Sequence, residues 1–163
     1  MSTAVEWTAA SIQEIIDALK AKPGAMLPIL HAIQEHIGYI PEQAVSQIAE
    51  SLLSTRAEVH GVISFYHHFR TSPPGKHIIE ICRAEACQAV GCRSLEAHAK
   101  ERLGVDYHQT TADRCFSLEP VYCLGNCAVG PNIRIGDEIH GRVSLERFDE
   151  IVSSHRQTMK EVG

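Results

Sequence analysis

The sequence predicts an α+β protein, with helices in the first half of the chain and a helix-flanked β-sheet in the second. Over residues 1–70, apolar residues recur every three to four positions, which is the period of amphipathic helices. Two prolines and a glycine within Ser72–Gly75 then interrupt the pattern. Short β-rich runs follow, alternating with helical segments. We therefore expect a helical domain over residues 1–72 and an α/β domain over residues 73–163.

Two helices are expected before residue 40. Ser11 and Glu14 fit a capping box near the start of the first helix. Gly38 suits the left-handed position that follows the second helix. The two apolar stripes are Ile12, Ile15, Ile16 and Leu19, and Met26, Leu30, Ile33 and Ile37.

Two further helices are expected before the break. Pro41 suits the first position of the third helix, because proline lacks the N–H that is unpaired there anyway. Thr55 and Glu58 fit a capping box at the start of the fourth helix. The stripes are Val45, Ile48, Ala49, Leu52 and Leu53, and Val59, Val62, Ile63 and Tyr66. Short connections predict that neighbouring helices run antiparallel or cross steeply.

The α/β domain begins with a β-rich run at residues 77–81, directly before Cys82. Residues 86–103 are predicted to be helical, with a break near Gly91, so that Cys87 lies at or just before the helix start. The polar residues 105–114 are expected to form a loop.

The rest of the domain is predicted to be three more strand regions and a final helix. Gly136-Asp137 suits a two-residue hairpin turn with glycine first. Ser144 is the expected N-cap of a helix that extends to about His155. Strands are expected at residues 116–118 and 121–122, on either side of Pro120, and at residues 133–135 and 138–140.

Four cysteines form two short clips, which are C-x4-C at Cys82 and Cys87 and C-x3-C at Cys123 and Cys127. Both sulfurs of such a clip can reach one centre. Four thiolates suit either a [2Fe–2S] cluster or a zinc ion, and the spacings exclude neither. The chain has no C-x-x-C motif, which counts against a thiol–disulfide exchanger.

Other residues near the clips receive more ordinary interpretations. Cys92 and Cys115 are interpreted as buried structural cysteines, since neither is well placed to be a ligand. The ten histidines include no H-E-x-x-H motif and are interpreted as structural or surface residues. Arg83 adjoins Cys82, where a cation would favour the reduced form of a cluster. A solvated arginine is the ordinary interpretation of this residue, and tuning of the reduction potential is the alternative hypothesis.

The composition disfavours several classes of function. The chain of 163 residues has a formal net charge of −5, which argues against nucleic acid or an anionic membrane as the main partner. No apolar run approaches the roughly 20 residues of a membrane span. The first residues lack an export signal, and six cysteines without such a signal favour a reducing compartment. We therefore expect a cytoplasmic protein without membrane insertion.

The clips and several other segments resemble one known family. The pattern C-x4-C-x35-C-x3-C, followed by Ala128–Pro131, is similar to that of the thioredoxin-like [2Fe–2S] ferredoxins. These are the small flavin-neighbouring subunits of NADH dehydrogenases and related complexes. The segments Leu27–His31, Gly38–Pro41 and Val62–Tyr66 resemble the same family. The resemblance implies a thioredoxin-like second domain and one [2Fe–2S] cluster held by the four cysteines of the clips.

Two segments, Phe65–Arg70 and Cys82–Gln88, are most similar to the gamma subunit of NAD-dependent, molybdenum-containing formate dehydrogenases. That resemblance implies electron transfer by a subunit without a complete active site of its own. FMN, the molybdenum cofactor and further Fe–S clusters would lie on partner chains. Residues 1–72 would dock the flavin- and NAD-binding partner, and through it a molybdenum-containing catalytic subunit.

Other assignments stay open. The same chain type serves NADH:quinone oxidoreductases and NAD-linked hydrogenases. A zinc-stabilised adaptor without a redox role is the alternative of another class. The aromatic segment Phe65–Arg70 suits either packing between the domains or partner docking.

Overall fold

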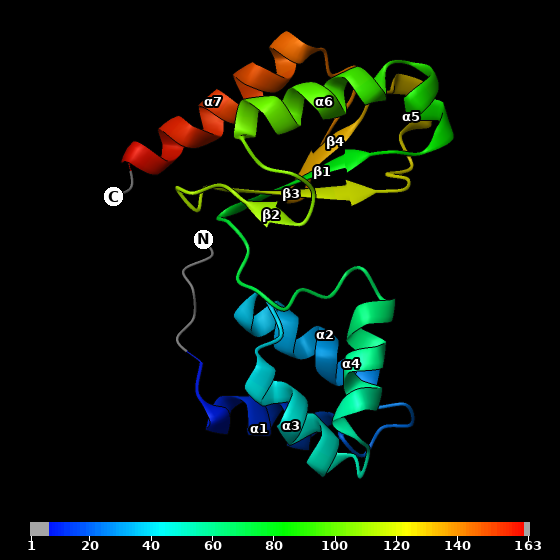
Figure 1. The fold of residues 1–163 in the computed structure, drawn as a ribbon, viewed down its shortest axis with the longest axis vertical. Helices are drawn as coiled ribbons and strands as arrows, with labels where there is room; N and C mark the ends of the chain where they lie inside the picture. Colours follow the sequence, from blue (N-terminus) through cyan, green and yellow to red (C-terminus); the bar gives the residue numbers. More distant parts are fainter. Residues whose placement is uncertain (1–6, 162–163) are drawn as a thin grey trace. The chain divides into compact units, whose positions relative to one another are not determined.

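The computed structural model describes residues 7–161 and divides between Pro74 and Gly75 into two compact units (Figure 1). Within the described residues, no helix combines the length and the apolar character needed to cross a membrane.

The first unit consists of four helices around one apolar core (Figure 1). Its helices are α1 (Ala9–Leu19), α2 (Met26–Ile37), α3 (Glu42–Ser51) and α4 (Arg56–Phe65). All four predicted stripes contribute to this core, so the helical period was read correctly. Two stripe residues are exceptions. Leu53 follows α3 with a φ of 52° and is 97% exposed, and Tyr66 follows α4 and is 43% exposed.

The ends of these helices partly correct the prediction. The capping box of α1 joins Thr8 and Ser11, not Ser11 and Glu14, because the helix begins one turn earlier than expected. Pro41 is the N-cap of α3 and lies one residue before the helix. The capping box of Thr55 and Glu58 is confirmed. The left-handed Gly38 after α2 is also confirmed, with a φ of 94°.

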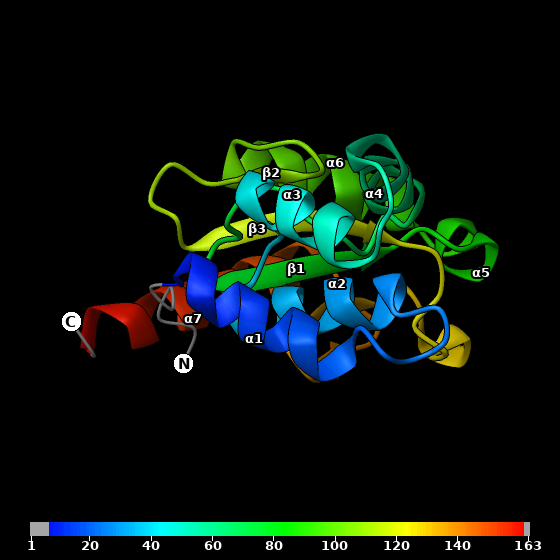
Figure 2. The ribbon, with the colours of Figure 1, turned by 90° about the horizontal axis from the view of Figure 1, so that it is seen from below.

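The second unit is a five-stranded sheet with helices. Its elements are β1 (His77–Cys82), α5 (Glu85–Ala89), α6 (Cys92–Leu103), β2 (Gln109–Thr110), β3 (Phe116–Val121), the 3-10 turn η1 (Cys127–Val129), β4 (Ile133–Ile135), β5 (Glu138–His140) and α7 (Leu145–Glu161). The strand order is β2-β3-β1-β4-β5. Among the strand pairs of the described residues, only β1 and β3 are parallel, and they run side by side in Figure 2.

Helices α6 and α7 pack together over one face of the sheet (Figure 1). Alternate strand residues such as Ile79, Ile81 and Leu118 meet Leu95 and Phe148 of the helices in one core. The strand residues between them point to the opposite face. There Glu80 pairs with Arg134, His108 with Glu119, and Thr110 with Ser117.

Two strand predictions needed correction. Residues 116–121 form one strand through Pro120 rather than two pieces. Leu118 accepts a hydrogen bond from His108 on the β2 side, whereas Val121 accepts one from Arg83 after β1. By alternation, the nitrogen of Pro120 faces the β2 side at a level that lies before Gln109, the first residue of β2, so no ladder bond is lost. The predicted loop over residues 105–114 contains the short strand β2.

Two turns of this unit were predicted correctly and one helix start was not. Gly91, with a φ of 98°, separates α5 from α6, and Gly136, with a φ of 60°, opens the β4–β5 hairpin. Ser144 accepts a hydrogen bond from the Arg147 N–H and so caps α7. Cys87 is the third residue of α5 rather than its start, because the helix begins at Glu85.

Candidate metal centre

Both cysteine clips lie at the same end of the sheet. Cys82 is the last residue of β1, and its partner in the parallel ladder is Val121, the last residue of β3. Because parallel strands end at the same edge, the loops that follow them meet there. Figure 1 shows α5, which carries Cys87, beside the loop after β3 that contains Cys123 and Cys127.

The sulfur of Cys82 is enclosed by backbone groups of both loops. Its side chain is buried, and the backbone N–H groups of Ala84 and Leu124 lie close enough to lower the pKa of its thiol. Leu124 belongs to the second clip, so this contact joins the two clips. Burial raises the pKa of the Cys82 thiol, the adjacent Cys87 thiol adds to the rise, and the two N–H groups oppose it.

Cys87 is fully buried in α5 and receives a hydrogen bond from the loop before β4. Asn132 Nδ2 lies 3.3 Å from Cys87 Sγ. A Cβ atom at Gly130 would lie 3.3 Å from the same sulfur and 2.9 Å from Val90 Cγ2. The loop therefore passes so close to Cys87 that residue 130 has no room for a side chain without movement of its neighbours.

The second clip lies at the surface. Cys123 and Cys127 are exposed, and their sulfurs are 3.9 Å apart. The Gly125 N–H donates to Cys123 Sγ at 3.3 Å, and Gly125 has a φ of 75°, which glycine adopts without strain. A backbone N–H of the glycine loop therefore points at a cysteine sulfur. The hydrogen bond with Cys123 is the main cause of the raised pKa of Cys127.

The donor set fits a cluster that takes two thiolates on each metal ion. Two thiolates on one tetrahedral ion, with bonds of about 2.3 Å, are about 3.8 Å apart, close to the observed separation of Cys123 and Cys127. Cys87 lies near enough to Cys127 to raise its pKa. None of the six cysteines forms a disulfide. Among the side chains that the structure describes, no three or more of His, Cys, Asp or Glu are arranged to hold one metal ion.

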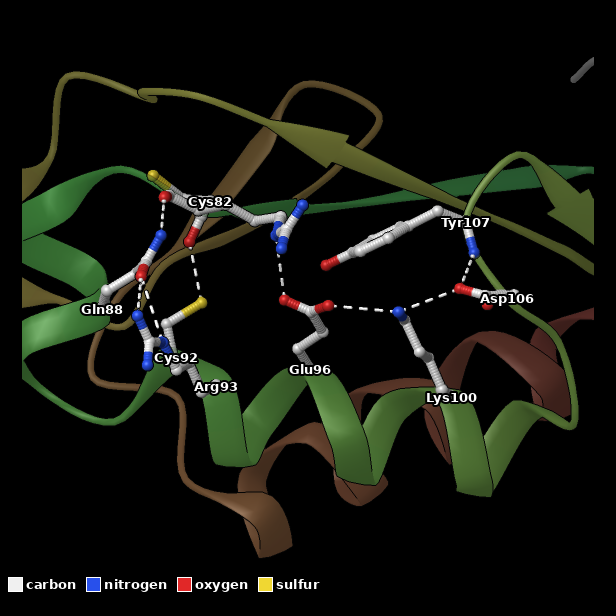
Figure 3. A network of polar contacts seen from close by, with 9 residues as sticks. Cys82, Gln88, Cys92, Arg93, Glu96, Lys100, Asp106 and Tyr107 are labelled. Atoms are coloured by element: carbon white, nitrogen blue, oxygen red, sulfur yellow. Dashed lines mark hydrogen bonds and ion pairs between the residues drawn. The ribbon is translucent and has the colours of Figure 1, made fainter.

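The two remaining cysteines, Cys92 and Cys115, are buried and lie outside the two clips. Cys92 opens α6, and its thiol donates to the Cys82 carbonyl oxygen at 2.8 Å (Figure 3). Burial raises the pKa of Cys92 to about 11. Cys115 lies before β3 in the core, and burial raises its pKa as well. Both positions agree with the structural interpretation.

Arg83 forms an ion pair that the sequence did not indicate. Its Nε lies 3.0 Å from Glu96 Oε2 on α6, and its guanidinium lies 5.4 Å from the centroid of the Tyr107 ring. Lys100 Nζ bridges Glu96 and Asp106 at 3.1 and 2.9 Å (Figure 3). The carboxylate of Glu96 raises the pKa of Arg83. Arg83 is therefore charged beside Cys82, and Glu96 offsets part of that charge.

Two residues of the site were missed from the sequence, namely Glu96 and Asn132. Glu96 is one of several charged residues on α6, and Asn132 follows a proline, where asparagine commonly marks a turn. Neither feature identifies a group that faces a cysteine loop. The helical period of α6 gives one usable signal, because it places Glu96 and Lys100 on one face.

Comparisons with known proteins agree with this geometry. A family model described as thioredoxin-like [2Fe–2S] ferredoxin matches residues 12–156. The NADP-reducing hydrogenase subunit HndA of Solidesulfovibrio fructosivorans is 31% identical over 144 residues, which are 88% of this chain and 84% of that protein. One subunit of the NADH-quinone oxidoreductase of Pseudomonas aeruginosa is 35% identical over 131 residues, which are 80% of this chain and 79% of that protein.

One solved structure is similar in fold. The crystal structure of an NAD⁺-reducing [NiFe]-hydrogenase in the air-oxidised state has a TM-score of 0.65 at 21% identity. The match covers 79% of this chain and 23% of the hydrogenase chain.

Proposed function

The chain belongs to the thioredoxin-like [2Fe–2S] ferredoxin family, and from this membership we propose that it is an electron-transfer subunit whose four clip cysteines hold one [2Fe–2S] cluster. A bound [2Fe–2S] cluster supplies reversible one-electron storage. The observation that carries the proposal is the meeting of the two clips. Asn132 Nδ2 donates to Cys87 Sγ of one clip and to the Asn126 carbonyl oxygen of the other, and the Leu124 N–H lies close enough to Cys82 to lower the pKa of its thiol.

The surroundings of the four sulfurs suit electron exchange with a partner. Cys82 and Cys87 are buried, whereas Cys123 and Cys127 are exposed. Two large apolar side chains flank the clips at the surface, since Tyr122 is 65% exposed and Val90 is 53% exposed. Apolar and aromatic side chains at a surface favour protein contacts. A partner that binds here would bring its own redox group near the exposed sulfurs.

For the parent complex, we propose an NAD-dependent formate dehydrogenase that contains molybdenum. What supports this choice is the resemblance of residues 65–70 and 82–88 to its gamma subunit. The named relatives belong to a hydrogenase and to an NADH-quinone oxidoreductase, and an equivalent role in such a complex is the alternative. In the proposed complex, FMN, the molybdenum cofactor and further Fe–S clusters lie on partner chains. We propose a cytoplasmic location, where cysteine thiols stay reduced.

We further propose that residues 1–72 dock the flavin- and NAD-binding partner. The aromatic segment at the end of α4 supports this role, because it is divided between the core and the surface. Phe69 is buried, and its ring lies 4.9 Å from that of His31, whereas Phe65 is 73% exposed. Gln34 holds the segment in place by donating to the His68 carbonyl and accepting from the Arg70 N–H, at 2.8 and 2.7 Å.

The cluster assignment is tested by anaerobic purification and metal analysis of the chain. We expect two irons and two sulfides per chain, and their loss in Cys123→Ser. The control Cys115→Ala removes a buried cysteine outside the clips and should keep both. One zinc per chain without sulfide would instead establish a zinc-stabilised adaptor.

The parent complex is tested by isolating it through a tag on this chain and identifying its subunits. We expect a flavoprotein and a molybdenum subunit, with formate-dependent reduction of NAD⁺ by the complex and none by the isolated chain. Hydrogenase or quinone-reducing subunits in the complex would establish the alternative. Formate turnover by the isolated chain would refute the proposed division of labour.

A further inference from the structure

Asn132 connects the two cysteine clips through its buried side chain. It lies between η1 and β4, with 0% of its surface exposed. Its Nδ2 donates to Cys87 Sγ at 3.3 Å and to the Asn126 carbonyl oxygen at 2.8 Å. Its Oδ1 accepts from Asn126 Nδ2 at 3.0 Å. One amide therefore contacts the first clip at a sulfur and the second clip at the residue before Cys127.

The hydrogen bonds of the Asn132 amide explain why this polar group can lie in the core. A buried amide without partners costs free energy, and here both Nδ2 hydrogens and Oδ1 have partners. A buried polar network that is fully satisfied favours one arrangement of its members. Any movement of the Asn126 loop away from Cys87 would break at least one of these bonds. The amide thus holds the two loops at one separation.

The contact with sulfur has a second consequence. The Nδ2–H group presents the positive end of its dipole to Cys87, and hydrogen bonds to cluster sulfurs help to set reduction potentials. An electron added to a cluster makes its sulfurs more negative, so an N–H donor stabilises the reduced form more than the oxidised form. Removal of the donor should lower the potential.

We propose that Asn132 is a positioning residue that couples the two clips and raises the reduction potential of the cluster. This inference rests on the proposed function, because it requires a cluster on Cys87.

The test compares two variants of Asn132 with a matched control. Asn132→Leu has a similar volume and removes every polar contact of the amide. Asn132→Asp keeps the shape and replaces the Nδ2 donor by a carboxylate oxygen. The control Cys115→Ala changes a buried residue of the same unit outside the clips and leaves every contact of Asn132 in place. Each protein is reconstituted anaerobically and assayed for iron and sulfide. It is then titrated with dithionite as the one-electron donor, with EPR as the readout.

We expect the Asn132 variants to have an equilibrium constant for reduction about tenfold lower than wild type, a midpoint shift of about −59 mV. The control should keep the wild-type midpoint. If either Asn132 variant carries a full cluster at the wild-type midpoint, the inference is overturned. If both variants fail to hold iron, thermal unfolding of the metal-free chains decides. A melting temperature of the metal-free variants equal to that of the wild type then supports the coupling of the clips. A lower melting temperature assigns Asn132 to general packing and overturns the inference.

The experiments distinguish a failure of the proposed function from a failure of this inference alone. A wild-type chain that binds no iron and sulfide overturns the proposed function, and this inference falls with it. A normal wild-type cluster together with unchanged Asn132 variants overturns the inference alone.

Discussion

At the scale of single residues, the charge beside Cys82 is set by a pair of side chains. The sequence leaves two interpretations of Arg83, a solvated side chain and a residue that tunes a cluster because it adjoins Cys82. The structure adds Glu96, whose carboxylate lies 3.0 Å from Arg83 Nε and whose side chain is largely buried. A cation favours the reduced cluster and an anion disfavours it. The two side chains therefore act in opposite directions, and each also determines where the other lies.

We predict that Arg83→Ala lowers the midpoint potential and that Glu96→Gln raises it, each by a change of about threefold in the reduction equilibrium, or about 28 mV. Glu96→Gln is the matched partner, because it removes a charge of opposite sign from the same ion pair. EPR-monitored titration of the reconstituted chains measures both. An unchanged midpoint in Arg83→Ala, or a shift of the same sign in both variants, would contradict the expectation.

A second effect of a single residue is the contribution of His77 to the stability of the chain at low pH. The His77 ring packs 5.7 Å from the Phe116 ring and 5.0 Å from the His155 ring, and its Nε2 is buried without a hydrogen-bond partner among the described residues. Burial lowers the pKa of His77 below its ordinary value of 6.5, and the charges of His155 and Lys76 add to the effect. The folded chain therefore binds this proton less tightly than the unfolded chain does.

The stability of the metal-free chain should consequently fall as the pH drops below about 6.5 and through the folded-state pKa of His77. Above that range the contribution of His77 is fully present. In His77→Gln, the free energy of unfolding should depend less steeply on pH between about pH 7 and about pH 5. Urea unfolding at a series of pH values measures the slope. Equal slopes in the two proteins would show that His77 is not the group responsible.

At the scale of elements, the start of the second unit depends on a close backbone contact. A Cβ atom at Gly75 would lie 2.7 Å from the carbonyl carbon of Phe116 and 3.0 Å from its Cα and N. The Gly75 N–H also donates to Ser117 Oγ at 2.7 Å. Both contacts are to β3, so the residue that leads into β1 is fixed against its neighbouring strand. Backbone atoms cannot move aside as a flexible side chain can.

We predict that Gly75→Ala destabilises the chain by about 1–3 kcal/mol through overpacking. The matched control is Gly61→Ala, within α4, where an added Cβ meets open space. Because alanine is the better helix former, the control should gain about 1 kcal/mol. Free energies of unfolding from urea titration decide the matter, and a neutral Gly75→Ala would speak against the contact.

Elements were predicted best where their signal is local. The four amphipathic helices, the capping box at Thr55, the break at Gly91 and the hairpin at Gly136 follow from residues a few positions apart. The short strand β2 and the passage of β3 through Pro120 do not. Both depend on which strand lies alongside and where it ends, and this is a property of the sheet.

At the scale of the whole molecule, the chain belongs to the thioredoxin-like [2Fe–2S] ferredoxin family and divides into two compact units at Pro74 and Gly75. The first unit has its own core of four helices, and the second has a sheet with two long helices over one face. The cysteine clips belong to the second unit alone. The chemistry of the proposed centre thus depends on the topology of one unit, while the first unit supplies an aromatic surface.

The helical periods, most turns and caps, and the two cysteine clips with their family resemblance could all be predicted from the order of the residues. These features come from short-range geometry and from residue chemistry, which a linear pattern contains. How the clips meet follows from the folded chain, because the parallel pairing of β1 with β3 brings their ends to one edge. The fold also places Asn132 against Cys87, which is 45 positions away along the chain. Such contacts depend on how distant segments pack, and burial then selects which polar groups can be satisfied there.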